Sequence, residues 1–197
     1  RYDTASDDDV VTTTHKPEGI KLVSELYPSQ SSMNISKAMT FVIHMLDPDN
    51  KRMNAGGDLG AFVSNDNLIM DGHHRWIASA MVNPGASLGG YLVDLPGANL
   101  VAILNAMTKG KFKVMKGKEA TGGFSQFQEG PIRKQLELFF QGGINSQTAS
   151  HEKFKGWQKR TPERVQELIQ GWTKQQGPAA VDAAVSKMVG NLSKINM

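Results

Sequence analysis

Apolar residues recur along the chain with two different spacings. Between residues 20 and 108, short apolar runs bounded by turn residues alternate with stretches whose apolar residues recur at helical spacing. We expect strands at 20–24, 61–63, 68–70 and 91–95, and helices at 35–46, 73–81 and 98–107. Such alternation of strands and helices is typical of an α/β or α+β domain.

The segments on either side of this domain follow other patterns. Residues 1–19 are polar, acidic and rich in threonine, which predicts a flexible arm. Residues 109–130 are basic and then rich in glycine and glutamine, which predicts a loop. Residues 131–197 have helical patterns, with strong helix starts at Thr161 and Gly177. The sequence therefore predicts an α+β fold in which an α-helical C-terminal region follows the domain.

Charge is distributed unevenly, although the net charge of the 197 residues is only +3. Residues 1–20 have a balance of −3, whereas residues 109–118 contain five lysines and no acid. A cluster of positive charge attracts polyanions. The lysines from Lys109 to Lys118 therefore indicate a nucleic-acid partner, and a solvated loop is the alternative interpretation.

Composition excludes several kinds of site. The chain has no cysteine, so disulfides, zinc–cysteine sites and cysteine nucleophiles are ruled out. No apolar run approaches the roughly 20 residues that a membrane-spanning helix needs. We therefore expect no membrane partner, and a soluble protein of the cytoplasm or of a virus particle.

The segment Asp71-Gly72-His73-His74-Arg75 lies between a predicted strand and a predicted helix. A helix start has unpaired N–H groups and about half a positive charge, and it binds anions such as phosphate. Gly72 lets a ligand approach the backbone closely, and Arg75 suits bidentate contact with phosphate. Three cationic side chains here would oppose the helix dipole, which favours an anion among them. The alternative is that the histidines are surface or capping residues.

This segment and its surroundings resemble a known superfamily. The run over residues 68–80, with Asp-Gly-His-His-Arg at its centre, resembles the signature of the ParB/sulfiredoxin superfamily. Residues 20–30 resemble that family's opening strand and turn, and the resemblance covers roughly residues 20–108. It implies a ParB/sulfiredoxin-like mixed-sheet domain that binds a nucleotide phosphate at the turn of Gly72 to Arg75. It implies nothing about residues 130–197.

The departures from the family pattern narrow the expected chemistry. His73 occupies the position of the sulfiredoxin catalytic cysteine, so repair of cysteine sulfinate is excluded. ParB has Gly-Glu-Arg-Arg here and uses CTP, whereas Gly-His-His-Arg is closest to the branch that includes free-serine kinases. That branch has a glutamate base at the position of Gln30, and glutamine is no base; free-serine kinase activity is therefore not expected. The expected catalytic residues are His73, His74 and Asp71, and the expected cofactor is ATP or CTP, with Mg²⁺ as its accompanying ion.

Two residues of the opening turn complete the predicted site. Ser29 and Gln30 are expected to line the phosphate pocket, because the opening turn faces the motif helix in this fold; the alternative is ordinary turn chemistry. Asp71 either binds a nucleotide-associated metal ion or caps the helix, and capping is the preferred interpretation. The expected nucleotide-binding residues are Gly72, His73, His74, Arg75, Ser29 and Gln30.

Three functions remain open at this stage. The first is an enzyme that transfers or hydrolyses a phosphoryl group or cuts nucleic acid. The second is a non-catalytic nucleic-acid-binding module that uses the lysine cluster. The third is a structural or assembly protein, for instance of a virus particle, that forms a homo-oligomer through its C-terminal helices. Fold alone does not choose among them.

Overall fold

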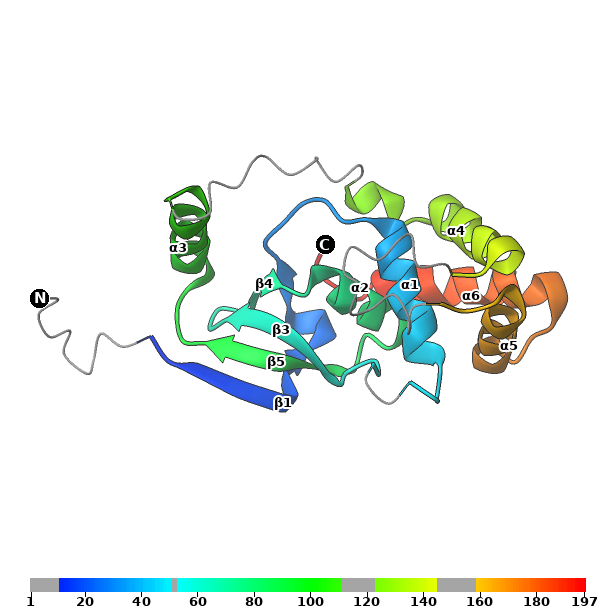
Figure 1. Cartoon of the computed structure of the whole chain (residues 1–197), viewed down its shortest axis with the longest axis horizontal. Helices are drawn as coiled ribbons and strands as arrows, with labels where there is room; N and C mark the ends of the chain where they lie inside the picture. The colour runs from blue at the N-terminus through cyan, green and yellow to red at the C-terminus, as the bar shows by residue number, and fades with distance from the viewer. Residues whose placement is uncertain (1–10, 51–52, 111–122, 145–158) are drawn as a thin grey trace, which may run out of the picture.

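The computed structural model describes residues 11–50, 53–110, 123–144 and 159–197 (Figure 1). Within these residues the chain forms a five-stranded sheet and six α-helices. Figure 1 shows the sheet on one side, α1 and α2 beside it, and the C-terminal helices grouped beyond them. The predicted α+β class is therefore confirmed.

The strands of the sheet lie in the order β1-β5-β3-β4-β2. Two neighbouring pairs, β2–β4 and β3–β5, are parallel, and the other two are antiparallel, so the sheet is mixed, as expected. The strand bounds are β1 Thr13–Leu22, β2 Tyr27–Pro28, β3 Asp58–Ser64, β4 Leu68–Asp71 and β5 Ser87–Val93. Because β2 and β4 are parallel, they end at the same edge of the sheet.

The predicted hairpin is formed by β3 and β4. The Ser64 hydroxyl accepts a hydrogen bond from the Leu68 N–H at 2.9 Å and donates one to the Asp66 carboxylate. Asn67 adopts the left-handed conformation, with φ of 70°, which asparagine tolerates better than most residues. Local turn chemistry thus sets the direction of β4, and β4 leads directly into α2.

The helices of the first part of the chain agree with the predicted positions. Their bounds are α1 Ile35–Leu46, α2 His73–Val82 and α3 Gly97–Gly110. Helix α2 packs against α1 and against β3. The ring of Trp76 is fully buried, and its Nε1 donates to the Val23 carbonyl at 2.9 Å. This contact connects α2 to η2, a short 3₁₀ turn over Val23–Glu25 that follows β1.

The C-terminal region is helical, as predicted, with α4 Glu129–Gly142, α5 Pro162–Thr173 and α6 Gly177–Leu192. These helices share one continuous apolar core with α1 and α2. The Asn191 side chain of α6 donates to the carbonyls of Met81 at 2.9 Å and Val82 at 3.4 Å. It thereby supplies donors to carbonyls at the end of α2 that have no partner within the helix. The apolar stripes of α5 and α6 are buried within the chain, and so give no support to the predicted homo-oligomer.

Two segments differ from the predicted boundaries. Residues 13–19 belong to β1 and not to a flexible arm, because backbone pairing with β5 needs no apolar side chains; residues 1–10 lie outside the described residues. The predicted loop of 109–130 contains a 3₁₀ turn, η3, at Phe124–Gln126, and α4 already begins at Glu129.

Most of the lysine cluster also lies outside the described part of the chain. Lys109 belongs to α3, and residues 111–122 are not described. No helix among the described residues is long and apolar enough to cross a lipid bilayer.

Candidate functional site

Gly72 forms the N-cap of α2 in a conformation that a side chain would strain. Its φ is 98° and its ψ is 11°, in the left-handed region, which glycine adopts readily. A Cβ at this position would lie 3.2 Å from the Cα of Ala61 in β3. Conformation and close packing therefore both favour glycine at the strand–helix junction. Asp71 does not cap the helix as predicted, because Gly72 occupies the N-cap position and no side-chain capping hydrogen bond is present.

His73 points toward the turn after β2. Its Nε2 lies 3.2 Å from the Ser29 backbone N–H nitrogen and 3.1 Å from the Ser29 Oγ. A backbone N–H can only donate, so Nε2 must be the acceptor and the ring is the neutral tautomer. Only 5% of His73 is exposed, and this burial lowers its pKa against the opposing effects of Asp71 and of a hydrogen bond to Ile69.

His74 points in a different direction, toward the start of α1. Its Nε2 accepts the Asn34 backbone N–H at 3.0 Å, and the Asn34 side chain caps α1 by accepting the Lys37 N–H at 2.9 Å. Burial, together with the charges of Lys37, His73 and Arg75, lowers the pKa of His74 to about 4 against the opposing effect of Asp71. His74 is therefore also neutral near pH 7.

Arg75 points toward β3. Its Nη1 donates to the Leu59 carbonyl, and its Nη2 lies 3.7 Å from the Asp71 carboxylate. The side chain is 29% exposed, whereas that of Asp71 is 75% exposed. Burial lowers the pKa of Arg75, but arginine remains charged near pH 7. Arg75 is thus the only cation that the motif supplies.

The three motif side chains therefore diverge and do not converge on a single point. Each connects the first turn of α2 to a different segment: His73 to Ser29, His74 to Asn34, and Arg75 to β3. The expectation of three cationic donors was wrong, because both histidines use Nε2 as an acceptor. Arg75 is therefore the one charged side chain of the motif that the helix dipole repels, and an anion is favoured beside this residue alone.

Ser29 and Gln30 line a pocket of about 570 Å³. Its walls come from the turn after β2, from η3 and from the end of the chain: Tyr27, Pro28, Ser29, Gln30, Ser31, Phe124, Asn196 and Met197. A volume of this size is typical of small-molecule sites. The prediction that Ser29 lies beside the motif helix is confirmed by its contacts with His73.

The described residues contain no group of three histidine, cysteine, aspartate or glutamate side chains placed to hold a metal ion. Asp71 pairs with Arg75, and its carboxylate is largely exposed. A magnesium ion that arrives with a nucleotide would be held mainly by phosphate oxygens and water. The expected role of Mg²⁺ therefore stays a prediction.

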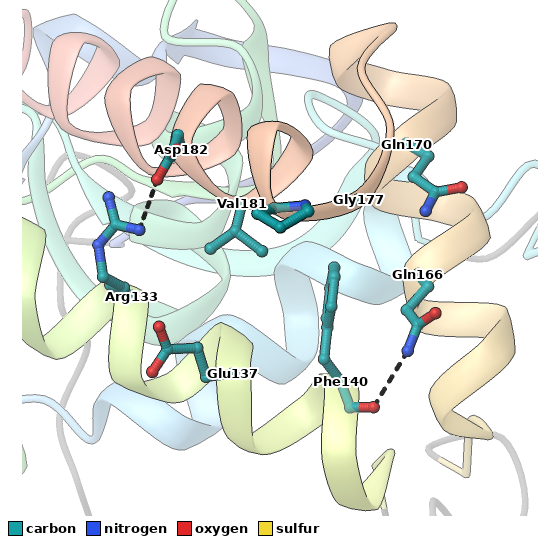
Figure 2. Close-up of a pocket in the computed structure, with 9 residues that line it drawn as sticks. Arg133, Glu137, Phe140, Gln166, Gln170, Gly177, Val181 and Asp182 are labelled. Atoms are coloured by element: carbon teal, nitrogen blue, oxygen red, sulfur yellow. Dashed lines mark hydrogen bonds and ion pairs between the residues drawn. The ribbon is translucent and has the colours of Figure 1, made fainter.

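A second pocket, of about 400 Å³, lies among the C-terminal helices (Figure 2). Arg133 of α4 pairs with Asp182 of α6 at 2.6 Å, and Gln166 of α5 donates to the Phe140 carbonyl at 3.2 Å. Figure 2 marks both contacts with dashed lines. These contacts join the three helices across the pocket. None of the site residues predicted from the sequence lines it.

The sheet carries a row of stacked aromatic and histidine rings that the sequence did not predict. His15 of β1 stacks on Tyr91 of β5 at 4.6 Å between ring centroids, and Phe62 of β3 stacks on the same ring at 5.0 Å. The Nε2 of His15 lies 2.8 Å from the Asp58 carboxylate. Cross-strand ring pairs of this kind stabilise a sheet, and only the strand register, which the sequence does not reveal, brings these residues together.

Comparison with known proteins gives no match: no family model, no curated protein and no solved structure is significantly similar to this chain.

Proposed function

We propose that the chain binds the phosphate group of a nucleotide at the first turn of α2, in a domain of the ParB/sulfiredoxin type. The observation that carries this proposal is the construction of that turn. Gly72 leaves the start of α2 without a capping side chain, and the first N–H groups of an α-helix have no partner within the helix. The Arg75 N–H donates to the Gly72 carbonyl at 3.0 Å, so the N–H groups before it are the ones offered to a ligand, and the Arg75 side chain supplies a cation beside them. Backbone donors of this kind and an arginine are a common combination for phosphate.

The neutral state of the two histidines supports anion binding at this position. Because Nε2 of His74 accepts the Asn34 N–H, the ring proton is on Nδ1, where it can donate to an anion. A neutral ring does not oppose the helix dipole as an imidazolium would. His73 and His74 also hold the Ser29–Asn34 turn against the helix start, which preorganises the surroundings of the ligand.

The position of the turn in the sheet supports the same proposal. β2 and β4 are parallel and both lead to this edge, and ligands of open sheets bind preferentially beyond the carboxyl ends of parallel strands. The order of strand, turn, helix, hairpin, motif helix, strand and helix also fits the ParB/sulfiredoxin resemblance. ATP and CTP are the proposed ligands, with Mg²⁺ on their phosphates.

We propose binding, and not phosphoryl transfer, as the function of this turn. A general base works best when its pKa lies near the operating pH, and the pKa of His74 is about 4. The Nε2 atom of His74 also already accepts the Asn34 N–H, and the hydroxyl that faces Nε2 of His73 is that of Ser29.

Calorimetric titration of ATP, CTP and GTP with Mg²⁺ tests the proposal. The proteins are the wild type, Arg75→Ala, and Lys134→Ala, which removes an exposed positive charge from α4. We expect Arg75→Ala to weaken binding about tenfold or more, as loss of a hydrogen bond to a charged group does, and Lys134→Ala to have no effect. Absence of nucleotide binding, or equal weakening in both variants, would contradict it. Circular dichroism of each variant checks that the fold is intact.

A further inference from the structure

The phosphate proposal uses the contact of the Ser29 N–H with His73 but not the contact of the Ser29 hydroxyl. The Ser29 Oγ lies 3.1 Å from the His73 Nε2, within hydrogen-bond distance. Ser29 is exposed and lines the 570 Å³ pocket, whereas His73 lies behind it and is 5% exposed. A solvent-accessible hydroxyl backed by a buried imidazole is the arrangement that activates a serine nucleophile.

The imidazole is in the state that a general base requires. The Ser29 N–H donates to Nε2 at 3.2 Å, so the lone pair of this atom points at Ser29 and carries no proton. The Ile69 carbonyl also accepts the Ser29 N–H at 3.2 Å, which fixes the Ser29 backbone in front of the ring. Burial lowers the pKa of His73, which keeps the ring neutral near pH 7.

The pocket in front of Ser29 restricts the kind of substrate. None of its eight lining residues has a charged side chain. The aromatic and apolar side chains of Tyr27, Phe124 and Met197 provide a wall for an apolar group. Gln30 lines the same pocket, and its amide carries N–H donors. A polyanionic phosphoryl substrate finds no cationic side chain here, whereas an uncharged ester fits the lining.

We propose that Ser29 is a nucleophile activated by His73 and that this pocket hydrolyses an uncharged carboxylic ester with an apolar acyl group. The Ser29 Oγ attacks the ester carbonyl and forms a C–O bond while Nε2 of His73 takes the hydroxyl proton. The intermediate collapses, the bond to the alcohol breaks, and His73 returns the proton to the departing alcohol oxygen. A water molecule then repeats the sequence, releases the acid and restores the Ser29 hydroxyl.

Gln30 has a supporting role in this reaction. The carbonyl oxygen becomes negatively charged in the tetrahedral intermediate, and hydrogen-bond donors near it lower the barrier. The Gln30 amide is a side-chain donor in the pocket beside Ser29. The reaction is independent of the phosphate site at Arg75, so each proposal stands or fails separately.

Covalent labelling with a fluorophosphonate probe tests the proposal, because the probe reacts with activated serines and leaves an adduct that mass spectrometry locates. The full chain is compared with Ser29→Ala, His73→Gln and Ser186→Ala. Glutamine at position 73 retains an acceptor for the Ser29 N–H but provides no base. Ser186→Ala is the matched control, since Ser186 is an exposed serine of α6 that does not line the pocket.

We expect an adduct on Ser29, a labelling rate about 100-fold or more lower in His73→Gln, as for loss of a general base, and an unchanged rate in Ser186→Ala. Hydrolysis of a p-nitrophenyl ester with a short acyl chain should follow the same order. A wild-type protein without an adduct on Ser29, or one whose labelling rate equals that of His73→Gln, would overturn the proposal. ATP titration of the labelled protein reports separately on the phosphate site.

Discussion

Replacing Asp47 with asparagine should destabilise the protein by about 3 kcal/mol, the lower end of the range for breaking a buried ion pair. The Asp47 side chain is 4% exposed, and its carboxylate accepts from Arg160 Nε at 2.8 Å and from Arg164 Nη2 at 2.7 Å. It lies at the end of α1, and both arginines lie at the start of α5 or just before it. The lower end applies because Arg164 keeps its contacts with Asp49 and Glu167.

Urea denaturation of Asp47→Asn beside Asp182→Asn measures this effect. Asp182 pairs with Arg133 at 2.6 Å, but its side chain is 64% exposed, and such surface pairs contribute about 0–1 kcal/mol. If Asp47→Asn lowers the free energy of unfolding no more than Asp182→Asn does, the buried Asp47 carboxylate does not fix the C-terminal helices to α1.

The pH dependence of stability gives the same experiment a second readout. Burial raises the pKa of Asp47, but hydrogen bonds from Arg164, the Asp49 N–H and Arg160 outweigh it and bring the pKa below its ordinary value of 3.8. The folded state therefore holds this proton less tightly than the unfolded state does. The contribution of Asp47 is complete above 3.8 and is lost as the pH falls through the lower, folded-state pKa. Asp47→Asn should lack this part of the acid sensitivity.

Further predictions concern the motif turn and a helix. Gly72→Ala should destabilise the protein by about 1–3 kcal/mol because Gly72 is in the left-handed conformation and contacts Ala61. Gly171→Ala within α5, where a Cβ meets no atom within 4 Å, should stabilise the protein by about 0.5–1 kcal/mol. Thermal unfolding measures both effects, and a stabilising Gly72→Ala would contradict the left-handed conformation of Gly72. The pKa of His74 falls from 6.5 to about 4 on folding, so the unfolded state binds its proton first, and stability should decline as the pH falls from about 6.5 toward 4. His74→Gln should flatten this decline, and an unchanged pH profile would show that His74 is not neutral in the folded protein.

Local chemistry in the sequence predicts much of the domain. The apolar spacing over residues 35–46 matches the bounds of α1, and Asn34 caps it. The turn residues from Ser64 to Asn67 predict the hairpin, and the helix start at Thr161 is capped by its own side chain. These features depend on residues a few positions apart, so a single sequence contains the information.

The remaining features depend on partners that are distant in the sequence. β1 begins at Thr13 because it pairs with β5, about eighty positions later at Val93, and no apolar alternation marks it. His73 and His74 were predicted as cationic donors because their partners in the Ser29–Asn34 turn, 44 and 40 positions away, are visible only in the fold. The tautomer of a histidine is a property of its surroundings and not of its neighbours in sequence.

The most direct test of the phosphate site follows the backbone amide resonances by heteronuclear NMR while ATP with Mg²⁺, and then inorganic phosphate alone, is added. If phosphate binds at the first turn of α2, the largest shifts should occur at the amides of His73, His74 and Arg75, and both ligands should move the same resonances. Shifts confined to other segments, such as the lysine-rich residues 109–118, or no shift at the start of α2, would rule out phosphate binding at this turn and would favour a nucleic-acid-binding or assembly role.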